Sequence, residues 1–413
     1  MWRVVGLTLF LQLGAAALCA ASAQDDEEVV VRGETFGPRL INNIRVRYEG
    51  ATTDDDPLRA DALTIRYRGT FETHLSERLT FLTEVEAVGA LLNNFDNGTG
   101  NEPERPVVLD PDGIELNRAQ IIAAINDDTR VTVGRQRIIL DDERFVGAFG
   151  FRQNDQTFDA VRVNSKLFDT VQLDASYVRR SNRALSNDNP NGVFRGDSYL
   201  LNANAPTPLG RVSVFHYALD LESGPTDDLS NDFSTRTTGV RLTGRRHWDD
   251  FGLVWEASYA RQTDFAENPI DYAANYWLGS VAAIVGDATF TFRSEILSSD
   301  NDIRAFQTPL GTLHKFQGDA DLFLVTPDHG VEDLSAALEW RFGSYGPIRD
   351  IKGSVRYHDF NGEFAGEQLG TEIDLAISAK YNRFGLSLAF ADYDADVFAT
   401  DTQRVFVTVT RAF

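Results

Sequence analysis

The chain has 413 residues and an acidic balance, with 62 Asp and Glu against 39 Lys and Arg. This balance argues against nucleic acid as a partner, because phosphate binding demands a basic face. The only cysteine is Cys19. It lies inside the leader sequence described next, so we expect the mature chain to have no disulfide, free thiol or cysteine metal ligand.

The N-terminus predicts a secretory signal peptide. Arg3 is followed by an uncharged run from residue 4 to residue 20, and then by the small-residue site Ala21-Ser22-Ala23. We expect residues 1–23 to be removed and residues 24–39 to form a short N-terminal periplasmic segment. A membrane-spanning anchor is the alternative, but the apolar run is short for a span.

From residue 40 onward, segments of about ten residues alternate apolar and polar side chains. Gly, Asn, Asp and Pro clusters separate these segments. Alternation at period two indicates extended strands. Good examples are residues 44–48, 63–72, 171–177, 240–244, 288–292, 334–342, 373–380 and 384–390. No amphipathic helix of ordinary length interrupts the series, so the chain is predicted to be all-β.

A soluble sandwich and a membrane barrel share this alternation, but in a membrane barrel the apolar face is outside. Aromatics such as Trp255 and Tyr259 gather near segment ends, as expected of girdles at the two membrane interfaces. The chain ends with Val407, Val409 and Phe413, similar to the signal that the barrel-assembly machinery reads. We therefore predict a single closed antiparallel transmembrane β-barrel over residues 40–413, with about 18 strands and 16 as the alternative, in a Gram-negative outer membrane.

The connections alternate in length, which predicts short periplasmic turns and long external loops. Residues 92–111 and 181–196 are the clearest external loops. The acidic run Asp54-Asp55-Asp56 suits weak Ca²⁺ binding, although a solvated loop face is the more common role of such a run. No other cofactor is expected. The expected partners are outer-membrane lipid, lipopolysaccharide and the assembly machinery, and we expect a monomer.

Catalytic motifs are missing from the sequence. None of the six histidines has a metal-ligand spacing such as H-E-x-x-H, and no G-x-S-x-G elbow is present. We therefore predict that the chain is not an enzyme. A Ser-His pair assembled from distant strands stays open as an alternative.

Alternation also predicts a lumen crowded with charge. The candidate inward arginines are Arg45, Arg47, Arg66, Arg68, Arg118, Arg241, Arg293, Arg341 and Arg356. They could form a positive constriction that draws anions. The same faces carry Glu72, Glu84, Glu86, Asp174, Glu256, Glu295, Asp333 and Glu339. A structural network of ion pairs across the wall is therefore the alternative.

Two regions resemble the alginate export porin family. The first contains Gly134–Arg137, Asp141–Phe145 and Phe151–Val161. The second contains Thr308–Leu310, His314–Gly318, Asp321–Leu324, Thr326-Pro327 and Gly330–Leu334. The resemblance implies an 18-stranded outer-membrane barrel whose electropositive, arginine-lined pore secretes alginate. It also implies loops that fold against the pore mouths.

By position, the resemblance implies particular roles for residues of these two regions. Pore arginines are implied at Arg135, Arg137 and Arg152, their acidic partners at Asp155 and Asp159, and loop residues near an opening at His314 and Lys315. Arg135 and Arg137 share parity with Val131 and Val133, so a regular strand cannot place the valines in lipid and the arginines in the lumen. A β-bulge at Gly134 would reverse the register. Otherwise the arginines emerge beyond the lipid.

The predicted function is a passive outer-membrane channel for an anionic polysaccharide or its oligomers. The residues predicted to line the pore or bind the solute are Arg66, Arg68, Arg135, Arg137, Arg152, Asp155, Asp159, Arg293, Lys315, Arg341 and Arg356. Arginines that hold successive carboxylates weakly would let a charged chain move from one to the next. A general porin for small hydrophilic solutes and, less favoured, a barrel enzyme are the alternatives.

Overall fold

The computed structural model describes residues 37–187, 189, 191–222 and 232–413. The expected signal peptide and most of the N-terminal segment lie outside the described residues. Among those residues, no helix is long and apolar enough to cross a membrane.

Eighteen strands form one antiparallel sheet, and the only described helix is the short 3-10 helix η1, Leu313–Lys315. The strands are β1 Arg39–Thr53, β2 Ala60–Ser76, β3 Leu79–Asn94, β4 Gly113–Ala124, β5 Thr129–Gln136, β6 Thr157–Leu167, β7 Val171–Asn182, β8 Val193–Thr207, β9 Gly210–Leu219, β10 Thr235–Trp248, β11 Phe251–Asp264, β12 Ala273–Val285, β13 Ala288–Leu297, β14 Val331–Tyr345, β15 Ile348–Asn361, β16 Gln368–Tyr381, β17 Phe384–Ala395 and β18 Thr402–Ala412. All the segments that the alternation predicted as strands lie within them.

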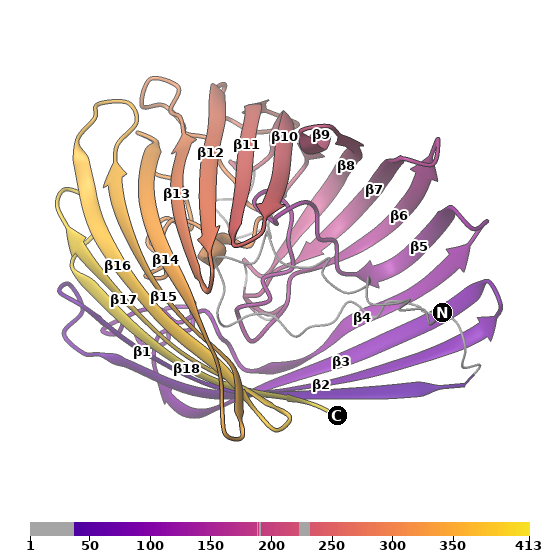
Figure 1. Ribbon diagram of the computed structural model, residues 1–413, viewed down its shortest axis with the longest axis horizontal. Coiled ribbons are helices and arrows are strands. Elements are labelled where there is room, and N and C mark those ends of the chain that lie inside the picture. Colours follow the sequence, from indigo (N-terminus) through magenta and orange to yellow (C-terminus); the bar gives the residue numbers. More distant parts are fainter. Residues whose placement is uncertain (1–36, 188, 190, 223–231) are drawn as a thin grey trace, which may run out of the picture.

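The sheet closes on itself because β18 pairs with β1, from Asn43 opposite Ala412 to Thr53 opposite Thr402. Every strand therefore has two neighbours, as Figure 1 shows for the ring of arrows. Closure leaves no edge with unpaired backbone groups, which a hydrocarbon environment would penalise heavily. The predicted closed barrel of 18 strands is confirmed.

The wall has an apolar outer face and a polar inner face over much of its height. On β2, Arg66 and Arg68 point inward and are buried, whereas Tyr67 between them is 41% exposed on the outside. On β16 and β17, Ile377 and Leu388 are 45% and 47% exposed on the outside. This is the inverted pattern expected of strands that face lipid.

The two ends of the barrel differ in the length of their connections. Short turns such as residues 77–78 and 168–170 lie at one end, where β1 begins and β18 ends. Long loops lie at the opposite end, which by this asymmetry is the external one. The first expected loop is confirmed as residues 95–112. The second is shorter than expected, residues 183–192, because β7 and β8 continue with polar residues beyond the apolar band.

Two external loops fold into the barrel rather than away from it. They are residues 137–156, between β5 and β6, and residues 298–330, between β13 and β14. A parallel bridge joins Val146 to Leu310, and the amide of Thr312 donates to the carbonyl of Glu143 at 2.9 Å. We call these two loops together the plug. Loop segments fill the interior of the ring in Figure 1.

Part of the inner wall is apolar, which the sequence analysis did not expect. Near the external end, Phe215, Tyr217 and Tyr276 point inward and are almost fully buried against Phe306 and Leu310 of the plug. Burial of each such side chain contributes roughly 1.5–3 kcal/mol. The expectation of a lumen crowded with charge is therefore wrong at this level, because the plug supplies an apolar partner there.

Candidate functional site

The inner wall of β1–β4 carries a buried network of arginines and carboxylates. Glu49 is fully buried and lies 2.8 Å from Arg47, 3.0 Å from Arg152 and 2.8 Å from Arg404. The guanidinium of Arg45 also donates to the plug carbonyls of Gly150 and Arg152. These arginines attach the plug to the wall, and no solute reaches them in this arrangement.

Further along the same wall, plug residue Asp155 joins two arginines. Arg68 donates to Asp155 and to Glu86, and it is 1% exposed. Arg137, just beyond the end of β5, also donates to Asp155 and lies 3.1 Å from Glu84. Arg66 is 0% exposed and donates to Asn43. Arg66 and Arg68 are therefore structural in this state rather than accessible to a solute.

Arg152 of the plug is enclosed as well, so it lines no open pore here. It is paired with both Glu49 and Asp321. Burial alone would lower the pKa of Arg152, but these two carboxylates outweigh it and raise that pKa. Burial would likewise raise the pKa of Asp321, but His314 and Arg152 hold it below its ordinary value. Both groups thus stay ionised.

The expected bulge at Gly134 is wrong. Pairing runs unbroken on both sides of β5, with Gly134 opposite Gln120 and Ala160. Arg135 therefore keeps the outward parity of Val133 and pairs with Asp159, the residue opposite it on β6, at 2.6 Å. Only Arg137, beyond the strand end, turns into the lumen.

Gly134 itself has a φ of +118°, and a Cβ there would lie 2.2 Å from the carbonyl oxygen of Ala119. The glycine thus allows close approach of the backbone without changing the register.

The two plug loops are joined to each other and to the wall through Arg144. This side chain is 2% exposed and lies 2.7 Å from Glu295 of β13. It also donates to Thr308 at 3.1 Å and to Gln317 at 2.9 Å, both in the second loop. Removal of Arg144 would leave Glu295 with Arg293, 3.2 Å away, as its remaining ion-pair partner.

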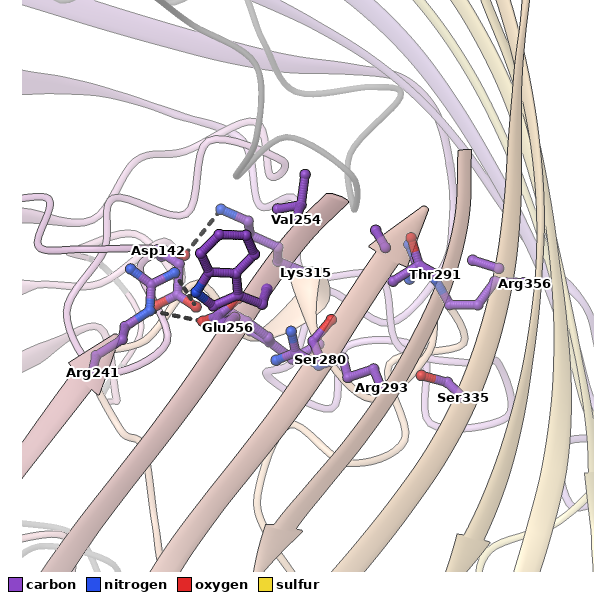
Figure 2. A pocket seen from close by; sticks show the side chains of 14 residues that line it. Asp142, Arg241, Val254, Glu256, Ser280, Thr291, Arg293, Lys315, Ser335 and Arg356 are labelled. Carbon is purple, nitrogen blue, oxygen red and sulfur yellow. Dashed lines mark hydrogen bonds and ion pairs between the residues drawn. The ribbon is translucent and has the colours of Figure 1, made fainter. Parts of the chain in front are cut away.

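A small cavity lies between the plug and the wall of β10–β15. Its volume open to water is about 80 Å³, which holds a few water molecules but is far below the 300 Å³ or more of ordinary ligand sites. Its charged lining residues are Asp142, Arg241, Glu256, Arg293, Lys315 and Arg356. Figure 2 shows them on neighbouring strands and on the plug.

The cavity holds an excess of positive charge, with four cationic and two acidic lining side chains. Arg241 lies 2.7 Å from Glu256 and 3.4 Å from Asp142. Lys315 donates to the backbone carbonyl of Asp142 at 2.9 Å. Burial would raise the pKa of Asp142, but Arg241, Arg293 and Lys315 outweigh it and lower that pKa. Two of the cations also have carboxylate neighbours outside the lining: Arg293 lies 3.2 Å from Glu295, and Lys315 lies 3.6 Å from Glu143.

Acidic groups gather where the plug meets β16. Asp319 donates its amide to Asp374 at 3.3 Å, and the amide of Ala320 donates to Glu372 at 2.7 Å. Burial and the nearby Asp374 raise the pKa of Asp319 to about 6, although His314 and Arg356 oppose the shift. Within the described residues, no group of acids, histidines or cysteines has the arrangement of a metal site.

Comparison with known proteins decides the family. The sequence profile described as alginate export matches residues 93–327, which is more than half of the chain. The chain belongs to the alginate export family. No curated protein matches this family member significantly over its sequence.

Solved structures share the fold of this alginate export family member. OpdK of Pseudomonas aeruginosa, solved with vanillate, is 15% identical and has a TM-score of 0.68 over 91% of this chain and 98% of its own. OccK9 (OpdG) of the same species is 14% identical, with a TM-score of 0.71 over 92% and 100%. OccAB4 of Acinetobacter baumannii is 15% identical, with a TM-score of 0.67 over 91% and 98%. The fold is that of outer-membrane porins, and this family member is a porin-type barrel of the Gram-negative outer membrane.

The remaining predicted residues of this alginate export protein lie in different surroundings. Arg293, Lys315 and Arg356 line the cavity. Arg341 has inward parity but is exposed near the short-turn end, away from the cavity. His314 does not lie near an opening, as the resemblance implied, but is buried and stacked on Phe151 with ring centroids 3.3 Å apart.

Sequence reasoning missed Asp142 and Arg144 as residues that shape the lumen. Both lie in a stretch without alternation, so no parity argument applied to them. A usable signal was present nonetheless, because the inward positions of β9 carry Phe215 and Tyr217 in place of polar residues. Inward aromatics on a barrel strand require an apolar partner inside the barrel, and this predicts a plug.

Proposed function

We propose that this protein is a passive channel for an anionic saccharide, either a uronic acid polymer such as alginate or its oligomers. The observation that carries the proposal is the cationic excess of the cavity between the plug and β10–β15. Family membership supports the same class of solute, since the matching profile is described as alginate export.

The geometry suits weak, repeated contacts with carboxylates. Arg241, Arg293 and Arg356 come from three different strands, so their guanidinium groups are distributed along the wall rather than gathered in one tight site. Arginine presents a planar fork that matches a carboxylate. A polymer with one carboxylate in each sugar could exchange contacts between such groups, and conduction requires that each contact be weak enough to break.

The plug limits the width of the path that is open to a solute inside the barrel. A cavity of about 80 Å³ is too small for a sugar ring. Passage of a saccharide therefore requires the two plug loops or the long cavity side chains to move. On the cavity side, the ion pairs Arg144–Glu295 and Asp142–Arg241 join the plug to the wall, and such a movement would have to break them.

Single-channel recording in planar bilayers tests the proposal. We expect anion selectivity, and reversible block by oligouronates at concentrations where neutral oligosaccharides of equal length have no effect. The variant Arg293→Gln/Arg356→Gln should lose most of both properties. A matched control is Arg245→Gln/Arg246→Gln on the exposed short-turn end of β10. Equal block by neutral and charged oligosaccharides would refute the saccharide proposal.

A second candidate is a channel for small carboxylic acids. The observation in its favour is the small cavity, and OpdK, which shares the fold, was solved with vanillate, a small aromatic carboxylate. Under this reading, a monocarboxylate would carry measurable current, and oligouronates longer than two sugars would neither block nor permeate.

A further inference from the structure

The outer wall near the external end has an uneven distribution of charge. On β8, β10 and β11, the outward positions beyond the apolar band carry Arg195, Arg236 and Arg261, and all three are exposed. On β14–β17, the outward positions at the same end carry acids: Glu332, Asp359, Asp392 and Asp394. We call the outward arginines of β8, β10 and β11 the basic arc of the rim, and the outward acids of β14–β17 the acidic arc.

Arg236 and Arg261 are the centre of the basic arc. Thr238 is the residue opposite Arg261, so Arg236 lies diagonal to Arg261 on the same face of neighbouring strands. Such diagonal neighbours are about 7–8 Å apart. Within the described part of the chain, neither guanidinium has a carboxylate within 4.0 Å. Two like charges this close repel each other unless an anion lies between them.

The surroundings of this pair place it at a membrane interface. Tyr259 lies two residues closer to the middle of β11 than Arg261, and its ring contacts Trp277 with centroids 4.3 Å apart. Trp277 is 52% exposed on the outer face. Aromatic girdles mark the level of lipid headgroups. The two guanidinium groups thus lie just external to the girdle, at the height of outer-leaflet headgroups.

Carboxylates on this part of the face have other partners. Asp220, two residues beyond the residue opposite Arg236, accepts a hydrogen bond from the amide of Asp197 at 3.0 Å. Asp197 on β8 is already engaged by Arg179 at 3.0 Å and by the hydroxyl of Tyr177. Glu222, whose backbone bridges to Arg195, lies on the far side of β9 from Arg261. The guanidinium of Arg236 packs over Phe265, 4.9 Å from the ring centroid, which holds it in place on the rim.

We propose that Arg236 and Arg261 bind a phosphate of an outer-leaflet glycolipid of the lipid A type directly. Guanidinium groups bind phosphate through paired charge-assisted hydrogen bonds. The acyl chains of the same molecule would lie along the apolar outward residues below, among them Val214 and Val240, which are 53% and 41% exposed. The acidic arc has the wrong sign for direct contact and would need a divalent cation as a bridge. This inference does not depend on the solute of the channel.

The test is titration of the whole barrel, in nonionic detergent, with bis-phosphorylated lipid A, read by native mass spectrometry in the presence of EDTA. The variant Arg236→Gln/Arg261→Gln should bind at least about tenfold more weakly than the wild type. Arg246→Gln/Arg383→Gln, which removes the same charge from exposed positions at the short-turn end, should bind like the wild type.

A second arm uses the unmodified protein, so it does not depend on variant folding. Dephosphorylated lipid A should bind the wild type as weakly as bis-phosphorylated lipid A binds the double variant. Loss of all binding in EDTA would assign the lipid to the acidic arc through bridging cations and overturn the proposal. Wild-type affinity in the double variant, or an equal loss in the control variant, would overturn it too.

Discussion

The two sides of the lumen use the same side chains in different ways. Along β1–β4, Arg47 and Arg68 are each 1% exposed and are closed over by the plug. Along β10–β15, Arg293 and Arg356 line a cavity that water can enter. Both sets have inward parity and carboxylate neighbours. The difference is the position of the plug, which packs against one wall and leaves space beside the other.

The comparison separates stability from selectivity. Charges buried on the β1–β4 side are paired because an unpaired buried charge is strongly destabilising. Charges beside the cavity keep contact with water, so an excess of one sign is tolerated there and can act on a solute. Substitutions of the same chemical type on the two sides should therefore change different measured properties.

The largest expected effect follows from Glu49→Gln on the buried side. Glu49 is the shared partner of Arg47, Arg152 and Arg404, so loss of its charge leaves three buried cations with too little compensation. We expect the free energy of unfolding to fall by about 3–5 kcal/mol, measured by urea titration of the barrel in lipid vesicles. A fall below about 1 kcal/mol would mean that water reaches this network.

A pH dependence should come from the contact between the plug and β16. The pKa of Asp319 is raised to about 6, so its charge destabilises the folded state above that pH. This penalty disappears as the pH falls through 6 toward 4, which is near the ordinary pKa of an aspartate. The groups that face Asp319 are Asp374, Asp321, His314 and Arg356, together with Glu372.

We therefore expect the plug to dock more tightly at pH 5 than at pH 7, by about 1 kcal/mol. Hydrogen exchange of residues 313–321 at the two pH values measures this difference. In Asp319→Asn, the change in protection between the two pH values should be smaller than in the wild type. Protection that increases with pH in the wild type would show that the predicted direction of the pH dependence is wrong.

A smaller effect is expected on selectivity from Glu256→Gln beside the cavity. Glu256 lies 2.7 Å from Arg241, and its neutralisation leaves the cationic excess larger by one charge. One charge near a partly aqueous path contributes about 1 kcal/mol, so the anion-to-cation permeability ratio should rise roughly two- to fivefold. The matched change on the buried side, Glu86→Gln, should lower stability and leave the ratio unchanged. Equal changes in the ratio would remove the distinction between the two sides.

Most of the fold could be predicted from the sequence, because alternation is a local property. The run 63–72 shows its two faces without reference to any other strand, and the last strand ends directly before the terminal Phe413. Even so, parity only says which side of the wall a residue faces. It could not say that Arg68 is enclosed while Arg356 lines a cavity, since that depends on loops far away in the sequence.

The candidate site was harder to predict because the plug has no periodic pattern. His314 was placed near an opening by resemblance, but the structure buries it between Phe151 and Asp321. Arg135 was assigned to the pore, yet unbroken pairing at Gly134 keeps its outward parity. Both errors have one cause. A loop position and a strand parity were inferred without the packing partners that decide them.

The smallest effect is expected where an ion pair faces solvent instead of the plug. Arg179 and Asp197 lie 3.0 Å apart on the outer rim, with side chains that are 64% and 54% exposed. Water screens such a pair, and holding two flexible side chains together opposes the attraction. Arg179→Gln should therefore lower the free energy of unfolding by less than about 1 kcal/mol. The same urea titration used for Glu49→Gln measures it, and raising the salt concentration should reduce the difference further. A loss as large as that of Glu49→Gln would mean that burial is not what separates strong from weak ion pairs in this barrel.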